Sequence, residues 1–221
     1  VKNGLKAIIV KEGLPKEDNN EDILKRLLRL VQIASNPKII DDNYNYEPGK
    51  YAYLLELVEE ICNKKEKSII WSNFTENVDE LTKYLRIFGA CKVHGKLSMP
   101  ERNRAIEKFL NDSESKVLIA TPGAAKEGLT LTVANHAIFY DRSFSLDDYL
   151  QSQDRIHRIS QTKICYIYNL IMENSIDEWV DILLESKELA AHLGQGDISQ
   201  EYYQSQISYD FGEIIREILG L

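Results

Sequence analysis

The chain has 221 residues, of which 43% are hydrophobic and 28% charged, the composition of a globular protein that can bury a substantial core. Its net charge is −8, but residues 171–221 hold eleven acidic and two basic residues, whereas residues 1–170 hold 24 and 25. The acidic total therefore does not exclude a nucleic-acid partner for the first 170 residues. The sequence has no run of 18 apolar residues and no signal-peptide pattern, so we expect neither a membrane span nor a membrane partner.

Cysteine and histidine spacing argues against a metal centre. Cys62, Cys91 and Cys165 are odd in number and lack C-x-x-C spacing, which disfavours structural zinc and a disulfide framework. The histidines at positions 94, 136, 157 and 192 show no ligand spacing either. We predict reduced, buried thiols in an intracellular protein and no structural metal.

Short apolar runs alternate with amphipathic segments along most of the chain. The expected strands cover residues 68–71, 90–93, 116–120, 136–140 and 164–171. The expected helices cover residues 23–33, 50–62, 78–88, 99–110 and 146–159, with another after Ser175. Ser98, Ser145 and Ser175, each followed three residues later by an acidic residue, fit capping boxes at helix starts. This alternation predicts an α/β fold in which a parallel sheet carries helices on both faces.

Three regions are expected. Residues 1–49 form a helical lead-in and linker, residues 50–190 form the sheet domain, and residues 191–221 form an acidic tail with a short helix near residues 214–219. The chain begins at Val1 without a start-like segment, so we interpret it as a piece of a longer protein.

Polar and small residues gather in four loops that follow predicted strands. These loops cover residues 72–75, 93–96, 120–132 and 141–144. In a parallel sheet such loops share one edge, where ligands bind. Hydroxyls, amides, lysines and arginines contact phosphates without reading bases, and helix N-termini favour anions. Each loop alone is more simply an ordinary turn, but four at one edge favour a nucleic-acid backbone.

Residues 151–161 carry two arginines in a predicted helix. At 100° per residue, Gln151, Asp154, Arg155 and Arg158 fall within one arc. Two guanidiniums one turn apart suit phosphate or carboxylate oxygens. The alternative is a solvated face on which Asp154 pairs with Arg158.

Two motifs of nucleotide-binding proteins are missing from this sequence. It contains no G-x-x-x-x-G-K-[ST] loop and no acidic Mg²⁺-binding box after a strand. We therefore expect the arginines to act as fingers in a site that another lobe completes.

The motifs resemble those of Swi/Snf-type ATPases in helicase superfamily two. Gln151-x-x-Asp154-Arg155-x-His157-Arg158-x-x-Gln161 looks like the sixth motif, and its final Gln161 distinguishes it from DEAD-box helicases. Residues 68–72 resemble the fourth motif, His94-Gly95-Lys96 with Arg102 resembles an Asp-Gly-Thr segment, and residues 121–132 resemble the fifth motif. The resemblance covers residues 24–190.

The sequence departs from the family pattern at two places. His94 stands where Asp is common, and residues 125–131 read Ala-Lys-Glu-Gly-Leu-Thr-Leu where Gly-Gly-x-Gly-x-Asn-Leu is usual. These differences suggest a divergent, bacterial or phage-borne branch.

The resemblance implies a RecA-like second motor lobe, with flanking helices, of a DNA-dependent ATPase that translocates on double-stranded DNA. ATP with Mg²⁺ would be held mainly by an N-terminal RecA-like lobe outside this sequence, so the chain alone would be inactive. Arg155 and Arg158 would be the catalytic arginine fingers. The residues implied at the ATP site or in coupling are Gln151, Asp154, Glu127, Gly128 and Thr130. The residues implied to contact DNA are Ser72, Asn73, Gly95, Lys96, Arg102 and Thr121.

Two other functions remain open from the sequence. One is a RecA-like module that binds nucleic acid or protein without catalysis, and the other is a strand-separating superfamily-two helicase. We expect a cytoplasmic, nucleoid-associated protein in a bacterium or phage and a nuclear protein in a eukaryote.

Overall fold

A parallel sheet of five strands organises the part of the chain that the structure describes. The structure is a computed structural model, and it describes residues 20–125 and 130–206. The strand order is β2-β3-β1-β4-β5. The strands are β1 (Ser68–Trp71), β2 (Cys91–Val93), β3 (Val117–Ala120), β4 (His136–Phe139) and β5 (Tyr166–Asn169). Each strand lies inside its predicted range, which confirms the parallel sheet.

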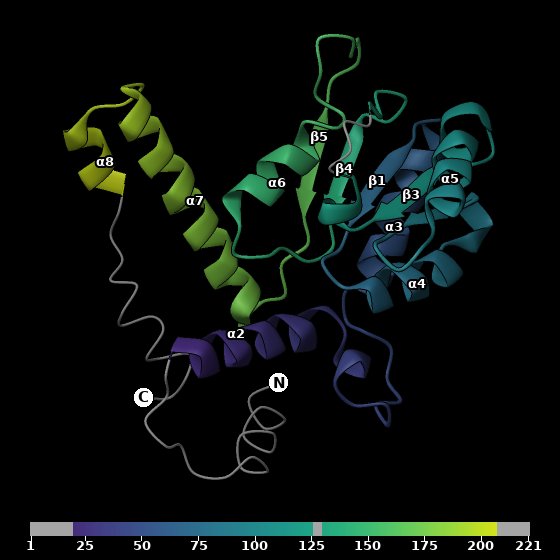
Figure 1. Cartoon of the computed structure of the whole chain (residues 1–221), viewed down its shortest axis with the longest axis horizontal. Coiled ribbons are helices and arrows are strands. Elements are labelled where there is room, and N and C mark those ends of the chain that lie inside the picture. Colours follow the sequence, from purple (N-terminus) through teal and green to yellow (C-terminus); the bar gives the residue numbers. More distant parts are fainter. Residues whose placement is uncertain (1–19, 126–129, 207–221) are drawn as a thin grey trace.

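Helices connect the strands and flank the sheet (Figure 1). The α-helices are α2 (Asn20–Ser35), α3 (Tyr51–Asn63), α4 (Thr75–Tyr84), α5 (Met99–Asn111), α6 (Leu146–Gln153), α7 (Ile176–Gln195) and α8 (Gln200–Gln206). The short 3₁₀ helices are η1 (Pro37–Ile39), η2 (Arg86–Phe88) and η3 (Pro122–Ala125). Among the described helices, none is both long and apolar enough to span a bilayer.

The core occupies both faces of the sheet. Ile69 and Trp71 of β1 belong to a buried cluster with Phe109 of α5. Ile70, between them, belongs to a second cluster with residues of α3 and α4 such as Leu54. Successive strand side chains point to opposite faces, so a strand that is apolar throughout must be covered twice. The prediction of helices on both faces is therefore confirmed.

The lead-in helix packs against the C-terminal part of the chain. Val31 of α2 lies in one buried cluster with Val180 and Leu184 of α7. In Figure 1, α2 lies across the first turns of α7, and α7 leads away from the sheet towards α8. Helix α7 continues past the predicted boundary at residue 190 and ends where Gly196 adopts φ 82°. Helix α8 was not expected from the sequence, and the helix expected near residues 214–219 lies outside the described residues.

The predicted serine caps are present in three forms. Ser98 and Glu101 form a full capping box at α5. The Ser145 hydroxyl accepts the Asp148 N–H at α6, and the Ser175 hydroxyl accepts the Asp177 N–H at α7. Each hydroxyl satisfies a helix N–H that has no partner within the helix.

The helix predicted for residues 146–159 is too long, and this changes where the two arginines lie. Helix α6 ends at Gln153, and residues 154–156 form a turn. Arg155 and Arg158 therefore do not share a helical face with Gln151. Ile156 is fully buried in the same cluster as Leu131, whose N–H donates to the Arg155 carbonyl. Apolar spacing cannot reveal this, because the partner lies on another loop.

Candidate functional site

The four polar loops meet at the carboxyl edge of the sheet, as predicted, but two of them bind each other there. The Asp141 carboxylate, after β4, accepts the Ser72 hydroxyl and both the N–H and side-chain amide of Asn73, after β1. Asn77 of α4 adds another bond at 3.2 Å. Burial raises the pKa of Asp141, and the bonds from Ser72 and Asn73 lower it in part.

This network fills the position at which open α/β sheets commonly bind ligands. β1 and β4 are neighbours whose onward connections run in opposite directions, which defines the switch point of the sheet. Asn73, Asp141 and Tyr149 help to line a remaining space of only about 10 Å³. Such a space holds about one water molecule. In this structure the edge between β1 and β4 is therefore occupied by the protein's own side chains.

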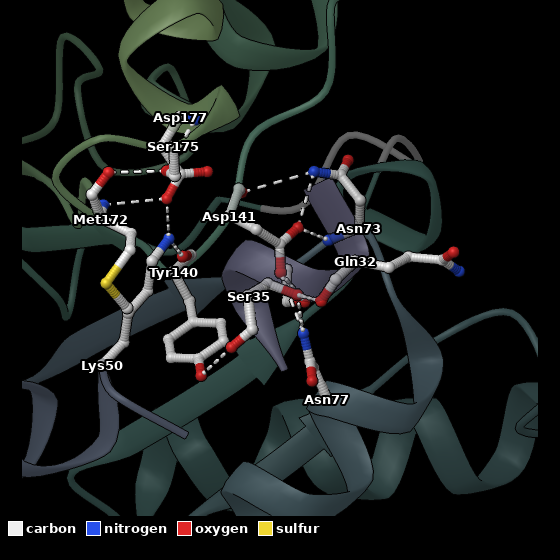
Figure 2. A network of polar contacts seen from close by, with 11 residues as sticks. Gln32, Ser35, Lys50, Asn73, Asn77, Tyr140, Asp141, Met172, Ser175 and Asp177 are labelled. Atoms are coloured by element: carbon white, nitrogen blue, oxygen red, sulfur yellow. Dashed lines mark hydrogen bonds and ion pairs between the residues drawn. The ribbon is translucent and has the colours of Figure 1, made fainter. Parts of the chain in front are cut away.

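A buried ion pair continues the network towards α7 (Figure 2). Lys50 Nζ lies 2.6 Å from Asp177 Oδ2 and donates to the Tyr140 carbonyl at 2.8 Å. Asp177 also accepts the Met172 N–H, and the Tyr140 hydroxyl donates to the Ser35 carbonyl. Burial lowers the pKa of Lys50, while the Asp177 carboxylate opposes this shift. The network thus joins α2, α3, β4 and α7.

Ser72 and Asn73 are consequently less available to DNA than the sequence predicted. Ser72 is completely buried, and its hydroxyl is bound to Asp141. Asn73 is half-buried, and its side-chain amide donates to the same carboxylate. These two side chains join the loops after β1 and β4 at the sheet edge.

The loop after β2 presents Gly95 and Lys96 to solvent. Gly95 is exposed, and a Cβ placed on it would meet nothing within 4 Å. Lys96 is exposed and pairs with Glu76 of α4 at 2.7 Å. Arg102 donates from Nε to the Leu97 carbonyl and from Nη2 to the Gly95 carbonyl. The predicted DNA-binding arginine therefore holds the loop in place.

Thr121 follows β3 at the same edge. It is half-buried, its N–H donates to Val93, and its carbonyl accepts the Ala124 N–H at the start of η3. The loop after β3 therefore lies beside the loop after β2.

The turn after α6 holds Arg155 in place through its backbone. The Leu131 N–H donates to the Arg155 carbonyl at 3.0 Å, and Ile156 is buried beside it. The side-chain amide of Gln161 donates to the carbonyls of Thr132, Ala134 and Ile156. In the sequence, Gln161 distinguished the motif from that of DEAD-box helicases. Only the structure shows that its side chain joins this turn to the loop at residues 130–134.

Arg155 is buried as a residue, and its charged group has no partner in the described part of the chain. The residue is 8% exposed, and among residues 20–125 and 130–206 none forms a hydrogen bond or ion pair with its guanidinium. Burial lowers the pKa of Arg155, the Arg158 charge lowers it further, and Asp154 partly opposes both. A guanidinium remains charged in proteins, so this site is suited to an anion.

Arg158 lies beside Arg155 at an open groove. The groove has a volume of about 940 Å³ and is lined by Thr130, Asp154, His157, Arg158, Ile159 and Ser160. Arg158 Nε donates to the Asp154 carbonyl at 3.2 Å, which replaces the carboxylate pairing considered from the sequence. Gln151 is exposed at the last turn of α6. Glu127 and Gly128 lie outside the described residues.

Comparisons with known proteins agree with this geometry. The family model described as "Helicase conserved C-terminal domain" matches residues 49–160. The SWI2/SNF2 ATPase core of Sulfolobus solfataricus, solved in complex with dsDNA, superposes with a TM-score of 0.68 at 25% identity, covering 94% of this chain and 46% of that one. The chain belongs to the C-terminal helicase lobes of Swi2/Snf2-type ATPases.

Curated relatives are consistent with this assignment. The Lymphoid-specific helicase of Homo sapiens is 33% identical over 141 residues, which are 63% of this chain and 17% of that protein. The ATP-dependent helicase FUN30 of Saccharomyces cerevisiae is 32% identical over 179 residues, 76% of this chain and 15% of that protein. The helicase lobe thus spans less than a fifth of either relative.

Proposed function

We propose that this helicase lobe is the second motor lobe of an ATP-driven, DNA-dependent translocase. The observation that carries the proposal is Arg155, a residue only 8% exposed whose guanidinium has no partner among the described residues, beside the groove that contains Arg158. Both belong to the segment that resembles the sixth motif. The chain would supply positive charge to a site whose other half lies on a preceding RecA-like lobe.

The two arginines suit the terminal phosphate of ATP. ATP with Mg²⁺, held mainly by the preceding lobe, would supply the phosphoryl group that is transferred to water. Arg155 would donate to the oxygens that gain charge during transfer, and its backbone bond to Leu131 would keep the guanidinium oriented. Arg158 would approach from the groove rim, near Gln151, Asp154 and Thr130.

Coupling to DNA would pass through the loop that follows β3. Residues 130–134 bond to the arginine turn through Leu131 and Gln161. We propose that this loop, with Glu127, Gly128 and Thr130, links the nucleotide state to DNA contact. A shift of the arginine turn would reach the loop directly, because hydrogen bonds join the two.

The DNA contacts would lie at the neighbouring loops. Within the described part of the chain the Gly95 N–H has no hydrogen-bond partner, and Lys96 and Thr121 lie near it at the same edge. An amide N–H, an ammonium and a hydroxyl bind phosphate without reading bases. The related Sulfolobus core was solved with double-stranded DNA, which supports this partner. Such a lobe would act at the nucleoid or in the nucleus.

The test joins this chain to the preceding RecA-like lobe that we propose for the full-length protein. The two-lobe protein should hydrolyse ATP faster with DNA, whereas the 221-residue chain should be inactive. Arg155→Ala and Arg158→Ala should each lower kcat by about 10³-fold. Arg86→Ala is the matched control, because Arg86 is exposed in η2 at the opposite edge of the sheet.

Arg155→Lys and thermal unfolding separate catalysis from stability. Lysine keeps the positive charge but lacks the planar guanidinium with its several donors. The Arg155→Lys protein should therefore fold normally, and its ATP hydrolysis should remain strongly impaired. Normal turnover in the Arg155 and Arg158 variants would refute the finger assignment. DNA binding without ATP hydrolysis in the two-lobe protein would instead favour a non-catalytic module, and strand displacement would indicate a helicase.

A further inference from the structure

The sheet ends on one side at β5, an edge strand whose outer backbone groups face no other strand in the described part of the chain. Within residues 20–125 and 130–206, β5 is last in the strand order and pairs only with β4 (Figure 1). The Tyr166 N–H donates to the Asn135 carbonyl, next to β4. Backbone groups alternate in direction along a strand, so the N–H and C=O groups of Ile167 and Asn169 point away from β4. These groups are free to bind a further strand.

This edge lacks the features that usually keep a sheet edge from pairing. Charged side chains, proline and short length protect exposed edges in most proteins. Residues 164–172 contain no charged residue, proline or glycine, and Ile164 and Tyr166 are 73% and 44% exposed. The strand at the other edge of the sheet, β2, has three residues and carries Lys92, which pairs with Asp79 of α4. Of these two edge strands, only β5 presents an uncharged stretch to solvent.

The charges that flank this uncharged stretch are opposite in sign. Lys163 precedes it and Glu173 follows it, and both are exposed. Lys163 Nζ lies 3.9 Å from Glu66 of the same chain, but the Lys163 side chain is 50% exposed and can reach a second acid. When a second copy of β5 lies antiparallel to the first with Tyr168 opposite Tyr168, each Lys163 faces the Glu173 of the other copy. An antiparallel copy is therefore complementary in charge at both ends of the stretch.

The same register matches the free backbone groups. With the Tyr168 residues at the two-fold axis, Ile167 of one copy lies opposite Asn169 of the other. Both residues direct their N–H and C=O groups outward, so each such pair can exchange two backbone hydrogen bonds, as in an ordinary antiparallel ladder. A two-fold contact requires a surface that is complementary to itself, and β5 meets this requirement in its backbone and in its flanking charges.

We propose that β5 is a dimerisation edge, at which two copies of this chain join their sheets in antiparallel orientation, centred on Tyr168. The proposal does not depend on the motor function proposed above. The two-fold axis would run perpendicular to the joined sheet, so the carboxyl edges of the two sheets would face opposite directions. The loops after β2 and β3, which lie on the far side of the sheet from β5, would remain uncovered. Because the paired strand is short, the interface would be small, and we expect a dimer that forms reversibly with concentration.

Analytical ultracentrifugation of the 221-residue chain over a series of concentrations tests the dimer. The wild-type mass should rise from 25.4 kDa towards twice that value. Ile167→Pro removes an outward N–H and no bond to β4, so the variant should keep its fold by circular dichroism. Its dimer dissociation constant should rise at least about tenfold, because the lost hydrogen bond occurs twice in the dimer. A wild-type chain that stays monomeric at every concentration would overturn the proposal and favour an extended segment of another protein at this edge.

Charge reversal tests the register without changing β5 itself. Lys163→Glu places acids opposite each other at both ends of the stretch and should weaken the dimer by about fivefold. The double variant Lys163→Glu/Glu173→Lys restores opposite charges and should recover the wild-type affinity. Lys83→Glu is the matched control, because Lys83 is exposed on α4 and its reversal should leave the dimer unchanged. No recovery in the double variant, or a dimer that is indifferent to both Ile167→Pro and Lys163→Glu, would overturn the pairing through β5.

Discussion

Replacing Lys50 by Met should strongly destabilise this lobe. Lys50 and Asp177 are 4% and 5% exposed, and their charged atoms lie 2.6 Å apart. Met approximates the length of the lysine stem and removes the ammonium. Asp177 would then be a buried carboxylate without its cation, and the Tyr140 carbonyl would lose a donor.

The expected cost follows from these two losses. Breaking a buried ion pair by removing one partner costs about 3–5 kcal/mol. The loss of a donor to the buried Tyr140 carbonyl contributes to this total and places the expected cost towards its upper end. Asp177→Asn should also destabilise, because it leaves Lys50 buried opposite a neutral amide. The double variant buries neither charge, so it should be less destabilised than the sum by about 2 kcal/mol.

Urea denaturation at pH 7 would measure these free energies of unfolding. Lys83→Met is the matched control, since Lys83 is exposed on α4 and should change stability by less than about 0.5 kcal/mol. A loss below about 1 kcal/mol for Lys50→Met, or strictly additive variants, would show that the pair does not hold α3, β4 and α7 together.

Two further predictions concern backbone and core positions, both read from thermal unfolding. Gly89→Ala should cost at least ~2 kcal/mol, because Gly89 has φ 66° and a Cβ would lie 2.2 Å from the Glu114 carbonyl oxygen. Gly196→Ala is the control: Gly196 has φ 82° but lies in open space, so this variant should cost about 1 kcal/mol. Equal losses would contradict the clash. Ile156→Ala should cost about 2–5 kcal/mol because Ile156 is fully buried, whereas the fully exposed Ile159 should tolerate Ala within about 0.5 kcal/mol. A small loss of stability for Ile156→Ala, below about 1 kcal/mol, would mean that Ile156 does not anchor the arginine turn in the core.

Local signals explain why much of the fold was predictable. Strands such as β1 are mostly apolar and buried throughout because both faces are covered, and Ser98 with Glu101 marks the start of α5 within four residues. The order of loops along the chain then brings the four strand ends to one edge. The family motifs lie on these same local segments.

The site could be predicted only in part, because several of its polar groups form hydrogen bonds with residues that are distant in the sequence. Ser72 and Asp141 are 69 residues apart, so no local pattern indicates that the Ser72 hydroxyl donates to this carboxylate. Arg102 likewise binds its own loop. Hydroxyls and guanidiniums suit DNA and protein acceptors equally well, so residue type alone cannot distinguish them.

The sequence by itself determined the parallel sheet, the edge that carries the polar loops and the two arginines of the sixth motif, since periodicity and spacing are local properties. The tertiary structure decided that α6 ends at Gln153, that Arg155 is nearly buried without a described partner, and that Lys50, Asp141 and Asp177 are buried. Burial and hydrogen bonding depend on segments that come into contact only after folding. These tertiary contacts determine which charged side chains remain available to a ligand.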